Sequence, residues 1–277
     1  MIQVCRLATI EEFSEAVKLQ QCVWQFADAE LVPLPVFVVA SQTGGQVLGA
    51  FDGSRMIGFC LAVPALKPDR QPYLHSHMLA VLPEYRNAGV GRRLKLEQRS
   101  DALSRGLDLM EWTFDPLQIK NAYFNIARLG AIVRRFLENE YGNTSSPFDG
   151  GLPTDRCVAE WRMASPRVEM ILSDTRPSQP PLRIEERISI PAAIDQFRRE
   201  DPERARKIQR STAERFQSAF NQGLAVIGFE RSQTEGIYLL GDFTAPPAPE
   251  PSLRERIRQI ETKPLGNLRR GGPEPAA

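Results

Sequence analysis

Apolar residues recur along the chain in two rhythms, and each rhythm predicts a different element. Short apolar stretches bounded by Gly, Pro or Asp indicate strands at residues 4–7, 47–51, 56–63, 73–81, 107–114, 131–137 and 157–163. Apolar residues three or four positions apart indicate helices at 10–26 and 119–129, and a further helix after Gly91. The order of these elements predicts an α/β (α+β) fold, with a mixed central sheet and helices on both faces.

Local signals at the ends of elements sharpen this prediction in two places and leave it open in a third. Thr9 and Glu12 have capping-box spacing at the start of the first helix. Asp52 and Gly53 lie between two apolar runs, which predicts a hairpin. The secondary structure of residues 33–41 is left undecided between a helix and a strand. The prolines end the first helix, and the apolar run that follows suits either element.

A change of composition divides the chain into four predicted parts. Residues 1–165 form the first domain, and residues 166–182, rich in Pro, Ser and charged residues, form a linker. Residues 183–244 form a smaller α+β segment whose order of strand, helices and hairpin echoes the first third of the chain. A degenerate half-repeat is one interpretation of that echo. Residues 245–277 contain abundant Pro and Gly with few apolar residues, which predicts a disordered tail.

Composition limits the classes of function open to the chain. The 277 residues are 42% hydrophobic, enough for a sizeable core, and the net charge of +1 gives no whole-chain attraction to nucleic acid. The sequence has no apolar run of membrane-spanning length and no signal-peptide pattern at its start, so we expect a cytoplasmic protein. Four cysteines without C-x-x-C spacing are expected to be buried free thiols, and no metal site is predicted.

One stretch carries a specific chemical signal. A predicted strand ends at Leu79-Ala80-Val81, and after a short turn the sequence Arg86-Asn87-Ala88-Gly89-Val90-Gly91-Arg92 leads into a helix. Glycine removes the Cβ atoms that would keep a ligand oxygen away from the backbone, and unpaired N–H groups at a helix start favour an anion. A diphosphate fits best. The spacing is neither G-x-x-x-x-G-K-[ST] nor G-x-G-x-x-G, which excludes P-loop and Rossmann interpretations.

This stretch resembles motif A of the GNAT N-acetyltransferase superfamily, whose R/Q-x-x-G-x-G/A loop holds the pyrophosphate of acetyl-CoA. Further similar motifs are Glu111-Trp112-Thr113-Phe114-Asp115-Pro116-Leu117, Asn121-Ala122, Leu129-Gly130-Ala131 and Asp155-Arg156. These motifs look like those of a predicted-acetyltransferase branch of that superfamily. The resemblance covers about residues 1–165, and more weakly the remainder. It implies a GNAT-like sheet in which the two strands beside the loop helix splay apart to admit the pantetheine arm.

The resemblance also implies a set of ligand-binding residues. Acetyl-CoA is the expected co-substrate, and the residues expected to bind it are Leu79, Ala80, Val81, Arg86, Asn87, Ala88, Gly89, Val90, Gly91, Arg92, Asn121 and Asn125. A backbone N–H near Leu79 is expected to hold the oxyanion, as in the family.

The chemistry of amine acylation requires a base, because a free alkylamine has a pKa of about 10.4. His75 lies eleven positions before Arg86, where some family members carry a catalytic carboxylate, and a histidine can serve as the base. A structural strand histidine is the alternative. A metal site is a further alternative, with His75 and His77 as ligands and Asp115 or Glu111 completing the set. Nothing in the sequence fixes the spacing of a third ligand.

The proton donor for the leaving thiolate is the main departure from the family pattern. Many GNAT proteins have N-x-x-A-x-x-x-Y-x-x-x-G-F, with the tyrosine as general acid, and aligning its glycine on Gly130 places Ile126 at the tyrosine position. Ile126 cannot donate a proton. Tyr123, one turn earlier, is the candidate substitute, with Asn121 and Asn125 on the same helix as alternatives, and a core or surface role for Tyr123 is equally open.

Two functions remain at this point. The first is an acyltransferase that moves an acetyl or other acyl group from acyl-CoA to an amine of a small molecule or amino acid. The second is a CoA-binding sensor or interaction module with reduced turnover. The expected partners are acyl-CoA and an amine acceptor, with neither nucleic acid nor membrane, and the chain is expected to be a monomer or a homodimer.

Overall fold

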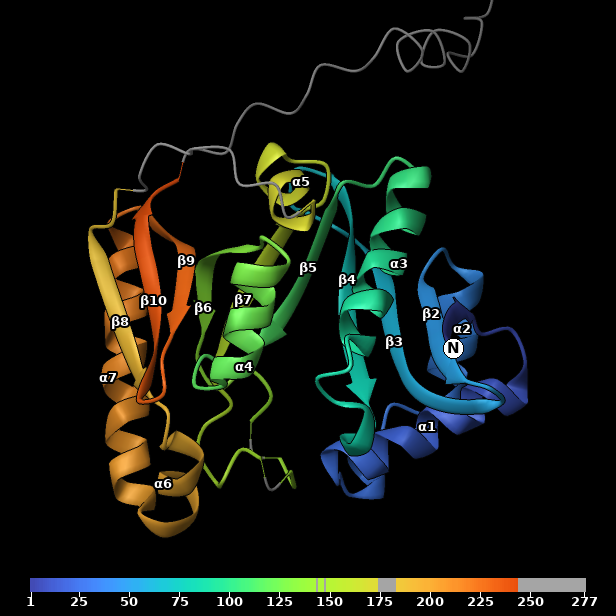
Figure 1. The fold of residues 1–277 in the computed structure, drawn as a ribbon, viewed down its shortest axis with the longest axis horizontal. Helices are drawn as coiled ribbons and strands as arrows, with labels where there is room; N and C mark the ends of the chain where they lie inside the picture. Colours follow the sequence, from blue (N-terminus) through green and yellow to red (C-terminus); the bar gives the residue numbers. More distant parts are fainter. Residues whose placement is uncertain (143, 147, 174–182, 244–277) are drawn as a thin grey trace, which may run out of the picture. The chain divides into compact units, whose positions relative to one another are not determined.

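A ten-stranded sheet organises the computed structural model, which describes residues 1–142, 144–146, 148–173 and 183–243. The strands lie in the order β1-β2-β3-β4-β5-β7-β6-β9-β10-β8 (Figure 1). Their bounds are β1 Ile2–Arg6, β2 Gln46–Asp52, β3 Arg55–Leu66, β4 Pro72–Val81, β5 Leu109–Phe114, β6 Ile132–Leu137, β7 Arg156–Arg162, β8 Glu186–Pro191, β9 Leu224–Arg231 and β10 Glu235–Asp242. The helices are α1 Ile10–Trp24, α2 Leu34–Gln42, α3 Val90–Ser104, α4 Ile119–Ala122, α5 Pro166–Leu172, α6 Ile194–Glu200 and α7 Pro202–Asn221, with short helical turns η1 Asp28–Glu30, η2 Pro83–Tyr85 and η3 Tyr123–Arg128. The prediction of a mixed α/β fold is confirmed.

The first four strands form an antiparallel array whose local signals act as predicted. Thr9 caps α1, and its side chain and that of Glu12 make both bonds of the capping box. The hairpin between β2 and β3 closes with Asp52 opposite Arg55. The open stretch 33–41 is helix α2, which buries Phe37 and Ala40, three positions apart.

The two faces of the sheet carry different helices. Phe59 of β3 packs on the rings of Trp24 and Phe37, so α1 and α2 cover one face, which we call the α1 face. Trp161 of β7 donates a hydrogen bond to the Leu129 carbonyl, after α4 and η3, so these elements cover the opposite face. Helix α3 lies on that opposite face too, which we call the α3 face, because its Lys95 touches Met110, the register partner of Trp161.

Strands β4 and β5 are parallel neighbours that separate along their length. Within these two fully described strands, pairing is confined to Leu74 with Met110 and His75 with Glu111. Strand β4 continues to Val81 without a further partner in β5. The splaying that the family resemblance implied is therefore present.

The predicted helix at 119–129 differs from the structure in its second half. Helix α4 ends at Ala122 and passes into the π-helical segment η3, in which the Leu129 amide bonds to the Phe124 carbonyl, five residues back. The chain then leaves the helix at Gly130, whose φ of 83° suits glycine. A wider helical turn has no distinct apolar rhythm over six residues, so the pattern could not show it.

The C-terminal segment continues the same sheet. Strand β9 joins β6 through the pair Val133 and Val226, and one hydrophobic cluster includes residues from both parts of the chain, among them Trp161 and Tyr238. The element order predicted for 183–244 is present, with two helices. The pairing differs from the first third of the chain, because β8 pairs with the second hairpin strand, β10, whereas β1 pairs with the first, β2.

Two further expectations meet the structure at the proposed boundaries. The first residues of the predicted linker form helix α5, which Ser165 caps by accepting a bond from the Val168 amide. Residues 174–182 and the predicted tail 245–277 lie outside the described residues. The division into domains stays a prediction.

The cysteines are only partly as expected. All four are free, and Cys60 and Cys157 are buried, but Cys5 and Cys22 are exposed. Cys5 lies on the edge strand β1 and Cys22 on the outer side of α1, so an apolar neighbourhood in sequence did not place them in the core.

One observation bears on membranes. In the described part of the chain, no single helix is long and apolar enough to cross a bilayer; the helices at Ile10–Trp24 and Asp28–Gln42, bent by 118° at their junction, meet the length and composition test only as a pair.

Candidate functional site

The glycine-rich stretch forms an open loop in front of helix α3. Asn87 and Gly89 have φ angles of 65° and 79°, and this left-handed backbone turns the chain from η2 into α3. Gly89 is the N-cap residue, and because it has no side chain, it cannot accept a capping hydrogen bond. The first N–H groups of α3 therefore keep their capacity to donate to a ligand. Residues 86–89 are all exposed, and no described residue partners the Arg86 guanidinium. The loop thus presents backbone donors and a cation to solvent.

Gly91 is not required by the fold. A Cβ built at this position would meet only the Cδ2 atom of Leu79, at 3.5 Å, which is ordinary van der Waals contact. Its backbone is right-handed helical, where alanine is favoured over glycine by about 1 kcal/mol. A glycine without a structural need at the start of this helix suits close approach of a ligand to the backbone.

Strand β4 contains an irregularity at the point where it leaves β5. In its register with β3, Leu61 faces Met78 and Ala62 faces Ser76, so His77 is an extra residue, a β-bulge. The bulge follows His75, the last residue that pairs with β5. It therefore marks the vertex at which the two strands part.

His75 lies on the α1 face at that vertex. Its pKa is lowered, first by burial and then by His77, whose ring centroid is 6.1 Å away, while Glu111 raises the pKa. The pKa of His77 is also lowered by burial of its ring, although the residue as a whole keeps substantial exposure. A histidine with a lowered pKa is neutral at pH 7 and can accept a proton.

Two buried carboxylates continue the polar surface beside His75. Glu111 and Glu160 are 3% and 6% exposed and face each other across β5 and β7. Glu111 bonds to Lys67 and, at 2.6 Å, to Arg135, and Glu160 bonds to Arg134. Each buried carboxylate is therefore paired with cations from the neighbouring loop and strand.

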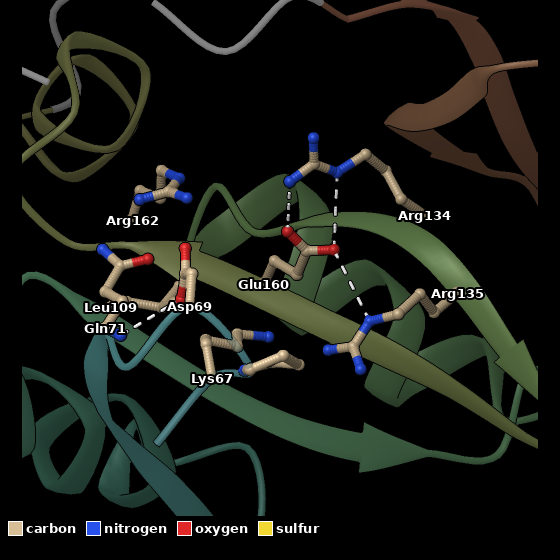
Figure 2. Close-up of a pocket in the computed structure, with 9 residues that line it drawn as sticks. Lys67, Asp69, Gln71, Leu109, Arg134, Arg135, Glu160 and Arg162 are labelled. Carbon is tan, nitrogen blue, oxygen red and sulfur yellow. Dashed lines mark hydrogen bonds and ion pairs between the residues drawn. The ribbon is translucent and has the colours of Figure 1, made fainter. Parts of the chain in front are cut away.

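An open cleft of about 500 Å³ lies over this ion-pair cluster (Figure 2). Arg162 also lines the cleft, but it stands apart from the ion pairs and no described residue partners its side chain. The residues that line the cleft are Lys67, Pro68, Asp69, Gln71, Leu109, Arg134, Arg135, Glu160 and Arg162. Four of them are cations and two are carboxylates, so the lining is net positive.

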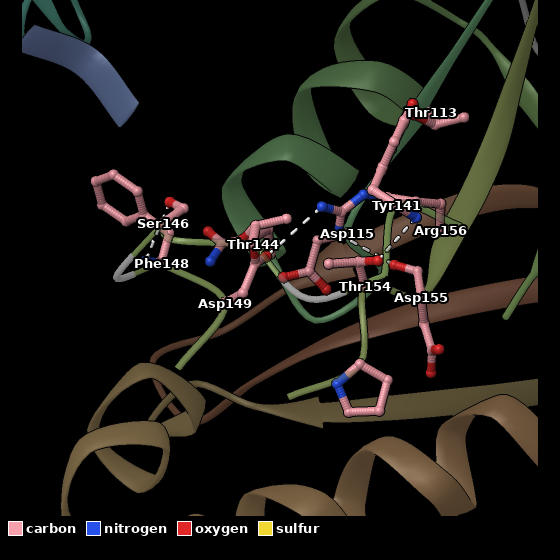
Figure 3. Close-up of polar contacts among 12 residues, drawn as sticks. Thr113, Asp115, Tyr141, Thr144, Ser146, Phe148, Asp149, Thr154, Asp155 and Arg156 are labelled. Atoms are coloured by element: carbon pink, nitrogen blue, oxygen red, sulfur yellow. Dashed lines mark hydrogen bonds and ion pairs between the residues drawn. The ribbon is translucent and has the colours of Figure 1, made fainter. Parts of the chain in front are cut away.

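The loop between β6 and β7 lies beside the C-terminal end of β5 (Figure 3). The hydroxyl groups of Thr113 and Tyr141 are 2.8 Å apart, which joins the loop to β5. Ser145 accepts a hydrogen bond from the Ala27 amide, and Ser146 donates one to the Trp24 carbonyl. The loop therefore links β5 to the chain that leaves α1.

The sequence-predicted site residues fall into two groups in the structure. Leu79, Ala80 and Val81 end β4 before the glycine-rich loop, as the sequence pattern predicted, and their binding of acetyl-CoA stays a prediction. Arg92 points elsewhere, since its guanidinium donates to the Leu172 carbonyl at the end of α5. Its role as a ligand-binding residue stays a prediction.

The predicted residues on α4 and η3 lie farther along the sheet. The Tyr123 ring lies 4.1 Å from the guanidinium of Arg231, a β9 residue, and β9 is four strands from β4 in the sheet order, about 19 Å at normal strand spacing. The structure thus brings Tyr123 to Arg231 and not to His75. Asn121 is exposed, and Asn125 is 4% exposed with no side-chain hydrogen bond to a described residue.

Sequence reasoning missed four charged residues of this region: Lys95, Glu160, Arg135 and Arg162. Glu160 lies in an apolar strand, and a lone charge in a buried run is a detectable signal. Lys95 lies among Arg92, Arg93 and Glu97, so its burial has no signature in the sequence. In the described part of the chain no three His, Cys, Asp or Glu side chains are grouped closely enough to hold a metal ion.

The sequence was compared with models of known protein families and with curated proteins. Residues 9–124 match the sequence model described as the acetyltransferase (GNAT) family. No curated protein matches the sequence.

Several solved structures resemble the fold. A Desulfovibrio desulfuricans protein described as a GNAT-family acetyltransferase is 16% identical and matches 59% of this chain and 100% of its own, with a TM-score of 0.48. A ribosomal-protein alanine N-acetyltransferase from Escherichia coli is 16% identical over 60% of this chain and 96% of its own, with a TM-score of 0.47. A GNAT-family acetyltransferase from Streptococcus pneumoniae is 14% identical over 58% and 98%, with a TM-score of 0.46.

At these identities and TM-scores, the solved structures assign neither a substrate nor the role of any residue. The family model covers the loop before α3, the parting strands and His75. Residues 9–124 of this chain thus match the family model of the GNAT acetyltransferases.

Proposed function

We propose that the protein transfers an acyl group, with acetyl as the simplest case, from acyl-CoA to an amine. The observation that carries this proposal is spatial. An anion-binding loop at the start of α3 follows directly on a strand that parts from its neighbour at His75. One binding path thus leads from a diphosphate site to a candidate base.

The loop residues fit the diphosphate of CoA. The Ala88 N–H bonds to the Tyr85 carbonyl, which leaves the N–H groups of Asn87, Gly89, Val90 and Gly91 as donors for the diphosphate. Arg86 is free to neutralise a phosphate charge. Because Gly91 has no Cβ atom, phosphate oxygens can approach the backbone at this position. The pantetheine arm then lies between β4 and β5, with the thioester near the bulge.

The reaction assigns His75 the first proton transfer. The acceptor amine attacks the thioester carbonyl carbon as its free base, and a new C–N bond forms while the carbonyl π electrons move to oxygen. His75 accepts the ammonium proton directly or through water. A backbone N–H near Leu79 stabilises the oxyanion, and collapse of the intermediate breaks the C–S bond.

The acceptor occupies the cleft beside His75. Glu111 connects the two, since it is the register partner of His75 and bonds both Lys67 and Arg135 of the cleft wall. Because Arg162 adds an unpaired cation, we propose that the acceptor carries a carboxylate or phosphate besides its amine. An amino acid is the simplest such compound.

A CoA-binding sensor without efficient turnover is the second candidate, and one observation favours it. Ile126 stands where many family members have the general acid, and it is fully buried. The two candidates differ in one readout: both predict stabilisation by CoA, but only the transferase releases CoA thiol in proportion to added amine.

The experiment is a thiol-release assay with acetyl-CoA and a panel of amines that differ in charge. We expect release with α-amino acids and lower release with their esters, which lack the carboxylate. Arg162→Gln should raise KM for the amino acid about 10-fold or more, and Arg93→Gln, an exposed position on α3, serves as the control. Equal activity towards acid and ester would contradict the acceptor assignment.

A further inference from the structure

Helix α3 carries a lysine whose amino group is inside the protein. Lys95 is 3% exposed, lies one turn after Gly91, and extends towards the sheet on the α3 face. Its Nζ donates a hydrogen bond of 2.8 Å to Ser76 Oγ of β4 and lies 3.8 Å from the centre of the Trp112 ring of β5.

These contacts place the amino group at the vertex where β4 and β5 part. Ser76 follows His75, and Trp112 follows Glu111, the last register pair between the two strands. Lys95 Nζ thus touches the first residue of each strand beyond the pairing. His75 lies on the α1 face of this vertex, and Lys95 lies on the α3 face.

Packing alone does not explain a lysine at this position. No described residue forms an ion pair with Lys95, and its other polar neighbour, Met110 Sδ, is a weak acceptor at 3.9 Å. Of the other buried residues of the helix, Val90, Leu94 and Ala102 are apolar, and Gln98 accepts a hydrogen bond from Ser76. A methionine would fill the same volume without the cost of desolvating an amine.

We propose that Lys95 protonates the thiolate of CoA as it leaves. This inference rests on the proposed acyl transfer, which brings the thioester to the vertex. When the C–S bond breaks, its electron pair stays on sulfur, and the sulfur takes a proton from the Lys95 ammonium, which leaves CoA thiol and a neutral amine. His75 has gained the amine proton on the opposite face, and solvent returns both groups to their starting states.

The surroundings tune Lys95 for this step. Burial lowers its pKa to about 7, so it holds a proton in a large fraction of molecules at neutral pH and loses it to a thiolate, whose conjugate acid has a pKa of about 8.5. The polar and titratable groups near it are Ser76 and His75 on β4, Cys60 on β3 and Gln98 on α3. Cys60, whose pKa burial raises to about 12, stays a neutral thiol in this range.

The test compares Lys95→Met and Lys95→Arg with the wild type in single-turnover release of CoA thiol. Single turnovers report the chemical step and not product release. Lys95→Met keeps the volume and removes the proton, whereas Lys95→Arg keeps the charge on a group that does not release its proton below pH 12. Lys207→Met, at an exposed position of α7, is the matched control.

We expect both Lys95 variants to lose about 100-fold in rate and to lack the fall in rate above about pH 7, while KM for acetyl-CoA and the stabilisation by CoA stay within threefold. A full rate in either variant, or an unchanged alkaline limb in Lys95→Met, would overturn the role of Lys95. If the wild type releases no thiol with any amine, the proposed transfer itself fails, which is a distinct result because CoA binding still reports a folded protein.

Discussion

Arg198 of α6 donates a hydrogen bond of 2.6 Å to the carboxylate of Asp115, at the end of β5. Their side chains are 5% and 13% exposed, and Arg198 also bonds the Phe148 carbonyl in the β6–β7 loop. Tyr238 of β10 makes a second link, a buried bond of 2.6 Å to the Pro116 carbonyl. Two hydrogen bonds thus join the C-terminal segment to Asp115 and Pro116, which follow strand β5.

The first prediction concerns this ion pair. Arg198→Met should lower the free energy of unfolding by about 3 kcal/mol, because it leaves the Asp115 carboxylate buried without its cation. Urea denaturation at pH 7 measures the change. Arg199→Met, an exposed neighbour on the same helix, should change stability by less than about 0.5 kcal/mol. Equal effects of the two substitutions would show that the pair does not hold the segments together.

The second prediction concerns the glycine-rich loop before α3, where we propose that the diphosphate binds. Gly91→Glu places a negative side chain where we expect the diphosphate, so it should abolish the stabilisation by CoA, which for the wild type is about 2.7 kcal/mol at a hundredfold excess over Kd. Ser100→Glu adds the same charge at an exposed position of α3 and should keep that stabilisation. Thermal denaturation with and without CoA measures both. An intact shift in Gly91→Glu would place CoA elsewhere.

The third prediction follows from the buried amine of Lys95. The folded pKa of about 7 is below the unfolded value of about 10.4, so between these values the unfolded chain binds more protons and stability rises with pH. This group alone contributes a slope of at most about 1.4 kcal/mol per pH unit. The unfolding free energy of the wild type should therefore rise relative to that of Lys95→Met as pH increases from 7 to 8.5. A constant difference would mean that the lysine titrates normally.

The fourth prediction assigns the acid side of the rate profile to His75. Its pKa is lowered, chiefly by burial, so the neutral base persists to a pH below the usual 6.5 and the rate falls only below that point. His75→Gln should lose this limb and about 100-fold in rate, whereas His77→Gln should keep the limb. Tyr123→Phe should leave the alkaline limb in place, because the tyrosine lies under Arg231. A retained limb in His75→Gln would leave His75 a structural strand residue.

The sequence was sufficient where the relevant residues are contiguous. The loop from Arg86 to Gly91 could be predicted because its glycines, its preceding strand and its helix follow one another in the chain. The fold of the first domain followed from the same kind of local pattern. By contrast, His75 meets Glu111 only through the register of two strands that a helix separates, and no local rhythm specifies register.

Burial of single charges was the second limit of the sequence. Lys95 lies in a helix rich in charge, and its burial depends on where Ser76 and Trp112 come together beneath it. Tyr123 was a reasonable substitute by helical position, but the wider turn of η3 and the added strand β9 give it a different neighbour. The exposure of Cys5 likewise depends on β1 being an edge strand, which the sheet order decides.

Transfer of an isotopically labelled acetyl group distinguishes acyl transfer to an amine from binding of CoA alone. Wild-type protein is incubated with labelled acetyl-CoA and an α-amino acid, and mass spectrometry follows the label. We expect an N-acetylated product equal in amount to the CoA thiol released, and loss of both in Gly91→Glu and His75→Gln. Binding of CoA with no labelled product from any amine in the panel would contradict acyl transfer and leave the protein a CoA-binding module.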